Sequence, residues 1–259
     1  AEKSELLADG LWALGVVAVE EAVADDGRTL LRTSVDESAT DRLQALAEGH
    51  GARLQWLSVP VEVADTWRQH AVPTHVSGDL WLVPAWLEPP PGRAVLVEPF
   101  DTFGLGNHPT TVLALRAAMG MAAAGSLVLD MGSGSGVLAV ALAKTAGAVC
   151  ECHDISTTAE HALEHNARVN GVAPAVRWRG PLSGADAGRY DLAVANILAP
   201  VLRDMAAALT AAVRPGGSIV LSGIRANQVD EVVARYELCT VHAVDTLDGW
   251  VAVTLGRVS

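Results

Sequence analysis

Long apolar runs are missing from this chain of 259 residues, although half of its residues are hydrophobic. No stretch reaches the roughly eighteen consecutive apolar residues that a membrane-spanning helix needs. Residues 1–10 are charged rather than arranged as a basic stretch followed by an apolar one, so a secretory signal is not expected either. We therefore expect a soluble, cytoplasmic protein with a sizeable buried core and no membrane partner.

Cysteine is scarce, and the spacing of the three residues present excludes the usual sulfur-based sites. Cys150 and Cys152 are one residue apart and Cys239 is distant, which fits neither a zinc site built from CxxC pairs nor a disulfide framework. The eight histidines are scattered without metal-ligand spacing. We predict packing cysteines in a reducing compartment and no metal.

Basic side chains are also few. The 18 Lys and Arg residues face 30 Asp and Glu residues, which gives a formal net charge of −12. Such a charge repels nucleic acid phosphates and attracts basic proteins. We therefore expect no direct nucleic acid binding and favour a basic protein as a partner.

The first 59 residues predict a small α/β domain. Apolar residues at helical or alternating spacing and a turn at Asp25-Asp26-Gly27 support this assignment. The domain begins directly on a helix. The expected order is helix 4–14, strand 16–23, strand 29–34, helix 37–49 and strand 53–59. Residues 60–99, rich in proline and tryptophan, are predicted to be a connector with one strand at 80–84.

From Phe103 onward, apolar strands alternate with helical stretches, the pattern of a parallel sheet with helices on both faces. We predict an α/β domain over residues 100–259 with a mostly parallel, seven-stranded sheet. Only a short turn separates its last two strands, which should form an antiparallel hairpin. The expected strands are 127–129, 149–153, 176–179, 192–195, 218–222, 237–244 and 249–256.

A glycine-rich turn is the strongest local signal. The apolar strand ending in Asp130 is followed by Gly132-x-Gly134-x-Gly136 and a helical run at 137–145. Glycine lets the backbone and the helix N-terminus approach a ligand closely. The alternative is a tight turn with only a structural role.

A second acidic residue makes the turn more informative. Asp154 lies 22 residues after Gly132 at the end of the next strand, where a carboxylate can accept both hydroxyls of a ribose. The glycine pattern and Asp130 before it argue against a pyrophosphate and for a ligand with a cationic sulfonium and an amino acid tail. S-adenosylmethionine meets that description, and we predict it as the cofactor.

Several motifs together resemble one known family. They are FGLGNHPTT at 103–111, DMGSGSG at 130–136, Asp154-Ile155, NARVNG at 166–171, NILA at 196–199 and LSGI at 221–224, with LWLVPAW at 80–86 in the connector. In this order they resemble the PrmA-type ribosomal protein methyltransferases. The resemblance implies a class I Rossmann-like methyltransferase domain, a ferredoxin-like recognition domain, and methylation of amino groups on protein eleven of the large ribosomal subunit. Because the predicted N-terminal domain lacks the first strand of that ferredoxin-like domain, we expect it to be shortened or rearranged.

The resemblance also implies cofactor contacts at four positions, Thr111, Gly132, Asp154 and Asn196. We extend the predicted cofactor site to neighbouring motif residues. These are Phe103, Gly104, Asp130, Gly134, Gly136 and Ile155. For two of the residues a structural role is the alternative, because Asn196 suits a turn or helix cap and Phe103 either walls the acceptor pocket or simply packs.

Methyl transfer from a sulfonium needs little acid or base chemistry, so positioning should dominate, with a contribution on the order of 7 to 11 kcal/mol. We predict that the Asn196 amide oxygen and the Ile197 carbonyl orient the acceptor amine. His108 is a candidate general base, although a loop histidine beside a proline is more often a structural hydrogen-bond partner.

Three positions depart from the family pattern. Leu105 and Asn107 stand where the family usually has threonines, and Ser156 stands where it has a second aspartate. These departures do not change the predicted cofactor, but they allow methyl acceptors other than the ribosomal protein. The alternatives to a ribosomal protein are a small-molecule amine or amino acid, another protein lysine, and a binding protein without catalysis.

Overall fold

The computed structural model describes residues 65–258 without interruption, together with 39–56, 27–33, 19–23 and the positions 7, 8, 10, 11, 14, 16 and 35. Two compact units divide at His70 and Ala71, inside the predicted connector. No helix in the described part of the chain is long and apolar enough to cross a membrane.

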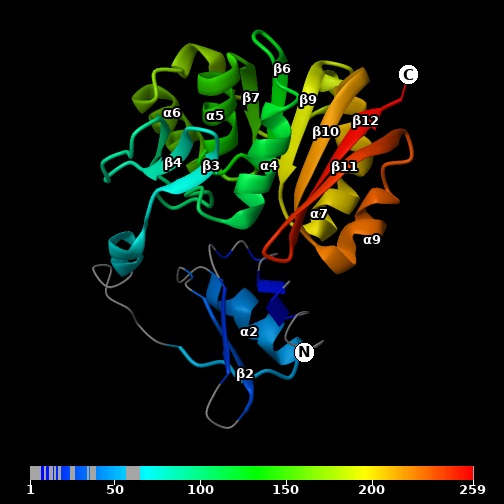
Figure 1. Cartoon of the computed structure of the whole chain (residues 1–259). Helices are drawn as coiled ribbons and strands as arrows, with labels where there is room; N and C mark the ends of the chain where they lie inside the picture. Colours follow the sequence, from blue (N-terminus) through cyan, green and yellow to red (C-terminus); the bar gives the residue numbers. More distant parts are fainter. Residues whose placement is uncertain are drawn as a thin grey trace. The chain divides into compact units, whose positions relative to one another are not determined.

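The first unit contains a two-stranded antiparallel sheet and a helix (Figure 1). Leu43 of the helix packs with Leu11 and Val16, since all three are buried. Residues 53–56 of the predicted last strand form no strand, and the rest of that strand and most of the first predicted helix lie outside the described residues. The elements are β1 Glu20–Val23, β2 Thr29–Arg32, α2 Thr40–Gly49 and the 3-10 helix η2 Asp65–His70.

The second unit opens with a three-stranded sheet where the sequence predicted only one strand. The predicted strand 80–84 is confirmed as the middle strand β4, Leu80–Pro84. β3, Thr74–Ser77, pairs with it in antiparallel fashion and β5, Arg93–Val97, in parallel. β5 was not predicted, because no local sequence pattern marks a parallel strand that a proline-rich loop joins to its neighbour.

A seven-stranded sheet, as predicted, dominates this unit. Its strand order is β11-β12-β10-β9-β6-β7-β8. β12 is antiparallel to both of its neighbours, which confirms the predicted closing hairpin, and the other strand pairs are parallel. The strands are β6 Leu127–Met131, β7 Val149–His153, β8 Val176–Trp178, β9 Tyr190–Asn196, β10 Val213–Arg225, β11 Cys239–Leu247 and β12 Trp250–Arg257.

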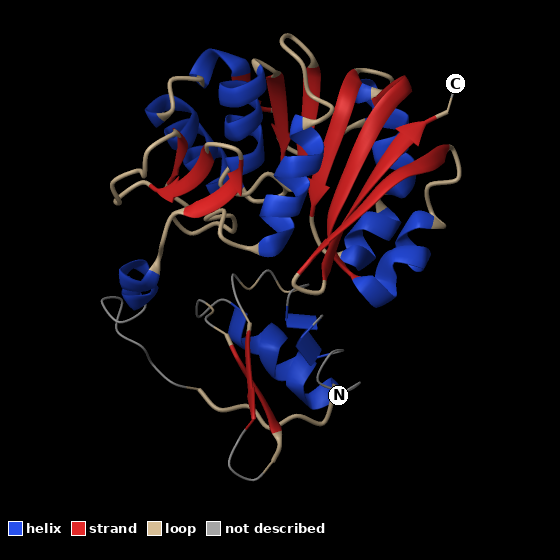
Figure 2. Cartoon of the chain, in the orientation of Figure 1, coloured by secondary structure: helices blue, strands red, loops and turns tan. Residues whose placement is uncertain are grey.

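Helices cover both faces of this sheet (Figure 2). One apolar core joins alternate strand residues to α4, α5 and α6, and the other joins the remaining strand residues to α7, α8 and α9. Cys150 and Cys152 are fully buried in the first core and make no disulfide. The helices are α4 Pro109–Met119, α5 Val137–Ala146, α6 Thr157–Val169, α7 Ala199–Asp204, α8 Ala206–Ala212 and α9 Val229–Val233, with 3-10 turns η3 Ala173–Ala175, η4 Gly184–Asp186 and η5 Ala226–Gln228.

Candidate functional site

The predicted glycine turn joins β6 to α5 and adopts a backbone that only glycine takes without strain. Gly132, Gly134 and Gly136 have φ angles of 70°, 49° and 75°. A Cβ added to Gly132 would lie 2.3 Å from Cγ2 of Ile197, and one added to Gly136 would lie 2.1 Å from Cδ1 of Leu163. Backbone conformation and close packing therefore both require these glycines.

Asp154 is held directly against this turn. The backbone amide of Gly134 donates a hydrogen bond to Oδ2 of Asp154 at 2.9 Å, and the amide of Ser156 donates to Oδ1 at 2.9 Å. Because a carboxylate oxygen has more than one acceptor direction, both oxygens keep capacity for ligand hydroxyls. Ser156, which stands in place of the family's aspartate, thus orients the carboxylate through its backbone.

Asp130 is buried beside the turn with only one of its oxygens paired. The amide of Ala139 donates to Oδ2 at 3.1 Å, whereas Oδ1 has no partner. Burial raises the pKa of this carboxyl to about 7, and the charge of Asp154 adds to the rise. Oγ of Ser133, in the same turn, is also buried without a partner. These unpaired polar atoms fit a ligand whose polar tail enters the turn.

The loop before α4 closes over the same turn. Ser135 donates from its backbone amide to the Phe103 carbonyl at 3.0 Å and from Oγ to the Gly104 carbonyl at 2.5 Å. Phe103 keeps 43% of its surface exposed, and Ile155, next to Asp154, keeps 89%. Two large apolar side chains are thus exposed to solvent beside the turn, as expected of side chains that line a nucleoside-binding pocket.

His108 caps the N-terminus of α4. Its Nδ1 accepts a hydrogen bond from the backbone amide of Thr110 at 3.3 Å and lies 2.7 Å from the Thr110 hydroxyl. The neutral ring therefore carries its proton on Nε2. Burial lowers the pKa of His108, and the positive charge of Arg225 adds to this effect. Both effects favour the neutral ring, and its Nδ1 already serves to cap the helix.

Asn196 and Ile197 lie at the carboxyl end of β9, beside the glycine turn. Nδ2 of Asn196 donates to the hydroxyl of Thr111 at 3.3 Å, and Thr111 is buried. A Cβ on Gly223 would lie 2.3 Å from the Ile197 carbonyl oxygen. β10 therefore packs tightly against Ile197. The structure brings together the predicted residues of four separate motifs at one edge of the sheet, where ligands of open α/β folds bind.

Two residues that the sequence did not indicate border this site. The Trp250 ring lies 4.9 Å from the His108 ring, and the Arg225 guanidinium lies 3.6 Å from the centre of the Trp250 ring. Their only local signal is the Asp248-Gly249 turn before Trp250, which predicts a hairpin but not a site.

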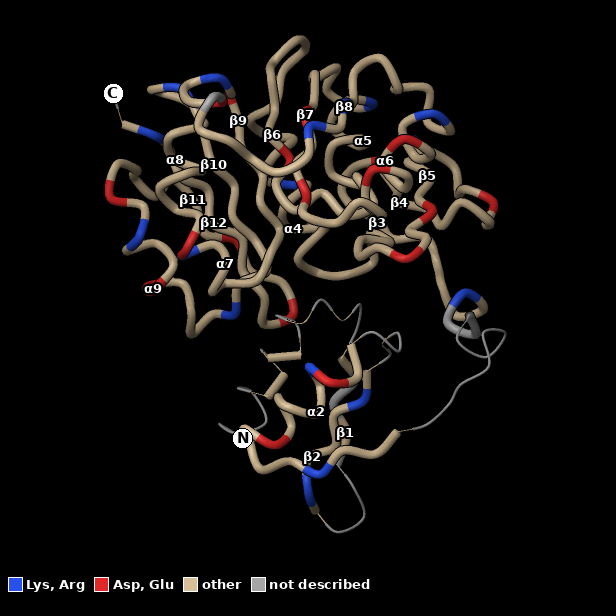
Figure 3. The backbone as a smooth tube through the Cα atoms, turned by 180° about the vertical axis from the view of Figure 1, so that it is seen from behind, with Lys and Arg blue, Asp and Glu red and all other residues tan. Residues whose placement is uncertain are grey.

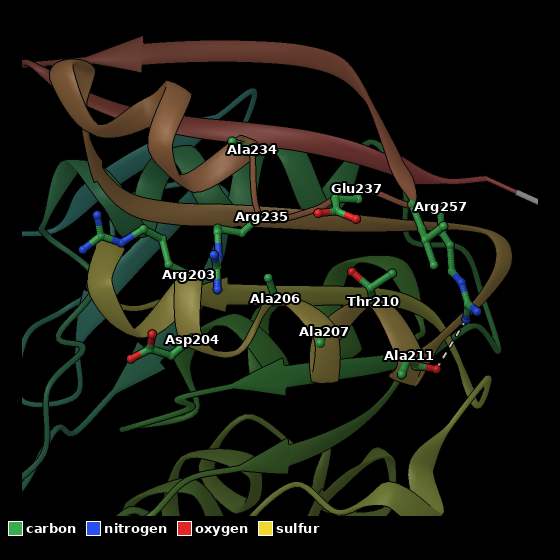
Figure 4. A pocket seen from close by; sticks show the side chains of 11 residues that line it. Arg203, Asp204, Ala206, Ala207, Thr210, Ala211, Ala234, Arg235, Glu237 and Arg257 are labelled. Carbon is green, nitrogen blue, oxygen red and sulfur yellow. Dashed lines mark hydrogen bonds between the residues drawn. The ribbon is translucent and has the colours of Figure 1, made fainter.

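A hollow of about 450 Å³ elsewhere on the second unit is lined by residues of α7 and α8, by the segment 234–238 between α9 and β11, and by the end of β12 (Figure 4). Arg203, Arg235 and Arg257 surround it together with Asp204 and Glu237. No predicted site residue lines this hollow, so it does not identify the ligand. In the described part of the chain no cluster of three or more metal-ligating side chains is present.

Comparison with known proteins places this geometry in a family. The model of the family described as "Ribosomal protein L11 methyltransferase (PrmA)" matches residues 35–257. The chain is 40% identical over 228 residues to the ribosomal protein L11 methyltransferase of Thiobacillus denitrificans, covering 86% of this chain and 76% of that protein. It is 36% identical to the same-named protein of Pseudomonas aeruginosa, covering 98% and 94%.

A solved structure agrees with these matches. The crystal structure of a ribosomal protein L11 methylase from Lactobacillus delbrueckii subsp. bulgaricus has a TM-score of 0.66 and 28% sequence identity. The match covers 72% of this chain and 99% of that one.

Proposed function

The chain belongs to the ribosomal protein L11 methyltransferase (PrmA) family, and from this membership we propose that it methylates amino groups of that ribosomal protein. It is an S-adenosylmethionine-dependent methyltransferase with a class I Rossmann-like fold. The net charge of −12 supports a basic protein as the acceptor. Acidic and basic positions are scattered over the described part of the second unit (Figure 3). We place the activity in the cytoplasm.

The bond between Gly134 and Asp154 carries the proposal, because it joins the glycine turn and the acid in one ligand-binding surface. Asp154 would hold the ribose hydroxyls, and Asp130 with Ser133 would face the polar tail of the cofactor. When bound, the cofactor supplies a methyl group already activated by the positive charge of its sulfonium.

Asn196 would position the acceptor. Since its Nδ2 is engaged by Thr111, the amide oxygen is left to accept a hydrogen bond from the incoming amine, and the Ile197 carbonyl supplies a second acceptor. These two acceptors would orient the amine lone pair toward the methyl group that the bound cofactor would supply. The proton that the methylated nitrogen has to lose would pass to water.

For His108 we favour positioning over general-base catalysis. Its Nδ1 already accepts the bond from Thr110, and a protonated Nε2 cannot accept a proton. Its cap sets the first turn of α4 and thereby the place of Thr111.

The proposal is tested by incubating the protein with methyl-labelled S-adenosylmethionine, the purified ribosomal protein and, separately, a small-metabolite extract. We expect label in the ribosomal protein, on amino groups identified by mass spectrometry. The Asn196→Ala variant, which removes the proposed positioning amide, should lose the label. Label confined to the metabolite fraction would contradict the proposal and favour a small-molecule amine as the acceptor. Cofactor binding without methyl transfer to the ribosomal protein or to any metabolite would favour a binding protein.

A further inference from the structure

Arg225 and Trp250 form a fixed pair at the border of the candidate site. Arg225 ends β10 and Trp250 begins β12, and the two are register partners in the antiparallel pair. The Arg225 guanidinium carbon lies 3.6 Å from the centre of the Trp250 ring, so the cation covers one face of the indole. The side chain of Arg225 is exposed, whereas Trp250 is half-buried.

A buried serine ties this pair to the acceptor side of the site. Oγ of Ser222 lies 3.0 Å from the Thr110 carbonyl and 3.4 Å from the Val251 carbonyl, which links β10 to the first turn of α4 and to the start of β12. Thr111, the next residue of α4, binds Asn196. The first turn of α4 therefore connects the start of β12 with Asn196, the residue proposed to position the amine.

Three rings lie together around His108, the cap of α4, and we call them the aromatic rim. His108 lies 4.9 Å from Trp250 and 6.1 Å from Phe103, both in edge-to-face orientation. Aromatic faces are favourable surroundings for ammonium and quaternary ammonium groups. In this rim, however, the protein's own guanidinium already occupies one face of Trp250.

The charge of Arg225 is not neutralised by a neighbour. Among the described residues no carboxylate forms an ion pair with it. Of the charged groups in the described chain, Arg225 is the one whose field acts on His108, where it adds to burial in lowering the pKa of the ring. The same field therefore reaches a group placed beside His108.

We propose that Arg225 is a specificity-determining residue that makes the site accept an amine in its neutral form and release the cationic methylated product. It does so by blocking a face of Trp250 and by placing a like charge beside the aromatic rim. The inference rests on the proposed function, since it requires an amine acceptor. A neutral amine meets no penalty, whereas a protonated or quaternary nitrogen meets a fixed positive charge.

The first test measures binding without turnover. Tetramethylammonium chloride is the probe, and saturation-transfer NMR in the presence of S-adenosylhomocysteine measures its affinity for the wild type, Arg225→Gln and Arg225→Lys. Arg235→Gln is the matched control, because it removes one exposed arginine on the hollow of Figure 4, away from the site residues. We expect Arg225→Gln to bind the probe roughly two- to thirty-fold more tightly, the range of one cation–π contact. Arg225→Lys and Arg235→Gln should stay near wild type.

The second test is the pH profile of kcat, which reports the protonation of the bound methyl acceptor. The profile rises as the bound amine loses its proton, and removing the like charge should move this rise to higher pH by about half a unit in Arg225→Gln. Arg225→Lys should keep the wild-type profile. A merely structural role would lower kcat at every pH without moving the rise.

Folded Arg225→Gln protein with unchanged probe affinity and an unmoved profile would overturn the inference. The two proposals fail separately. Wild-type protein that leaves the ribosomal protein unlabelled contradicts the proposed function, whereas the probe comparison needs no turnover and judges Arg225 alone.

Discussion

The backbone amide of Gly134 donates a hydrogen bond to the carboxylate of Asp154 across a distance of 2.9 Å. One residue belongs to the turn after β6 and the other to the end of β7, twenty residues later in the chain. The bond orients the carboxylate before any ligand binds, which reduces the entropy that binding must overcome. Several consequences can be measured.

Replacing Asp154 should weaken cofactor binding. Asp154→Ala removes acceptors for the ribose hydroxyls, and hydrogen bonds to charged groups contribute about 1.5 to 3 kcal/mol, so the Kd for S-adenosylhomocysteine should rise at least ten-fold. Isothermal titration calorimetry measures it. Glu160→Gln, an exposed acid on the following helix, is the control. Equal affinity of Asp154→Ala and wild type would remove the ribose assignment.

Gly132→Ala should disturb both stability and the site, and Gly188→Ala separates the causes. Both glycines have positive φ angles, 70° and 65°, but a Cβ on Gly188 meets open space whereas one on Gly132 lies 2.3 Å from Ile197. Gly188→Ala should cost about 1 to 2 kcal/mol, the penalty for an L-residue in this conformation. Gly132→Ala should cost more and also weaken S-adenosylhomocysteine binding. Thermal denaturation measures the loss of stability, and calorimetry measures the affinity for S-adenosylhomocysteine. Identical losses in the two variants would show that the contact with Ile197 is unimportant.

The buried Asp130 should make the ligand-free protein less stable as the pH rises. Its pKa is about 7 in the folded protein and 3.8 for an aspartate side chain in water. Between these values the folded state binds more protons than the unfolded state, so the free energy of unfolding falls with increasing pH. From pH 5 to pH 8 the loss should be roughly 2 to 3 kcal/mol, at about 1.4 kcal/mol per pH unit.

Asp130→Asn removes this titration, so urea unfolding at pH 5 and pH 8 should show a smaller loss than in wild type. Asp79→Asn is the control, because Arg93 lowers the pKa of Asp79 and its titration ends below pH 5. If Asp130→Asn loses as much stability as wild type between pH 5 and pH 8, the pKa of Asp130 is not raised.

Thr111→Val should lower kcat more than cofactor affinity. The hydroxyl of Thr111 fixes the Asn196 amide, and without it the amide can turn its nitrogen toward the acceptor. A misplaced positioning group can cost up to about a hundred-fold in rate. Thr111→Ser keeps the acceptor and should retain most activity. If both variants lose cofactor affinity instead, Thr111 acts as a cofactor contact.

The sequence predicted those parts of the fold that depend on local periodicity and glycine chemistry. The seven strands of the large sheet were placed within a few residues, because buried parallel strands are short apolar runs bounded by turns. β7 was predicted with its observed bounds. The glycine turn and Asp154 were also predicted to meet, since parallel neighbours end at the same edge of a sheet.

The features that the sequence did not predict depend on contacts between residues that are distant in the chain. β5 follows a proline-rich run, and helix α6, about seventy residues later, binds its backbone. Arg225 and Trp250 become neighbours only through the register of β10 and β12. The tautomer of His108 follows from the bond with Thr110, which a motif does not reveal.

Asn166 of α6 and Asn170, the residue that caps its C-terminus, pair with backbone groups of residues 96 and 98 much as a neighbouring strand would. Oδ1 of Asn170 accepts from the Leu96 amide at 2.9 Å and its Nδ2 donates to the Leu96 carbonyl at 2.7 Å. Asn166 makes the same pair of bonds with Glu98 at 2.8 and 2.9 Å, and its Nδ2 also donates to the Ser135 carbonyl at 2.9 Å. Both asparagines anchor β5 and the residue after it, but only Asn166 reaches the glycine turn.

Alanine variants of the two should therefore differ in function although both lose stability. Leaving buried backbone groups unpaired costs about 1 to 3 kcal/mol in each case, and faster hydrogen exchange at Leu96 or Glu98 should locate the loss. Asn166→Ala should also weaken S-adenosylhomocysteine binding, because Ser135 sits in the turn that orients Asp154, whereas Asn170→Ala should bind it normally. Asn227→Ala, at an exposed position in the 3-10 turn η5, is the control. Equal cofactor affinities of the two variants would mean that α6 supports β5 without shaping the cofactor site.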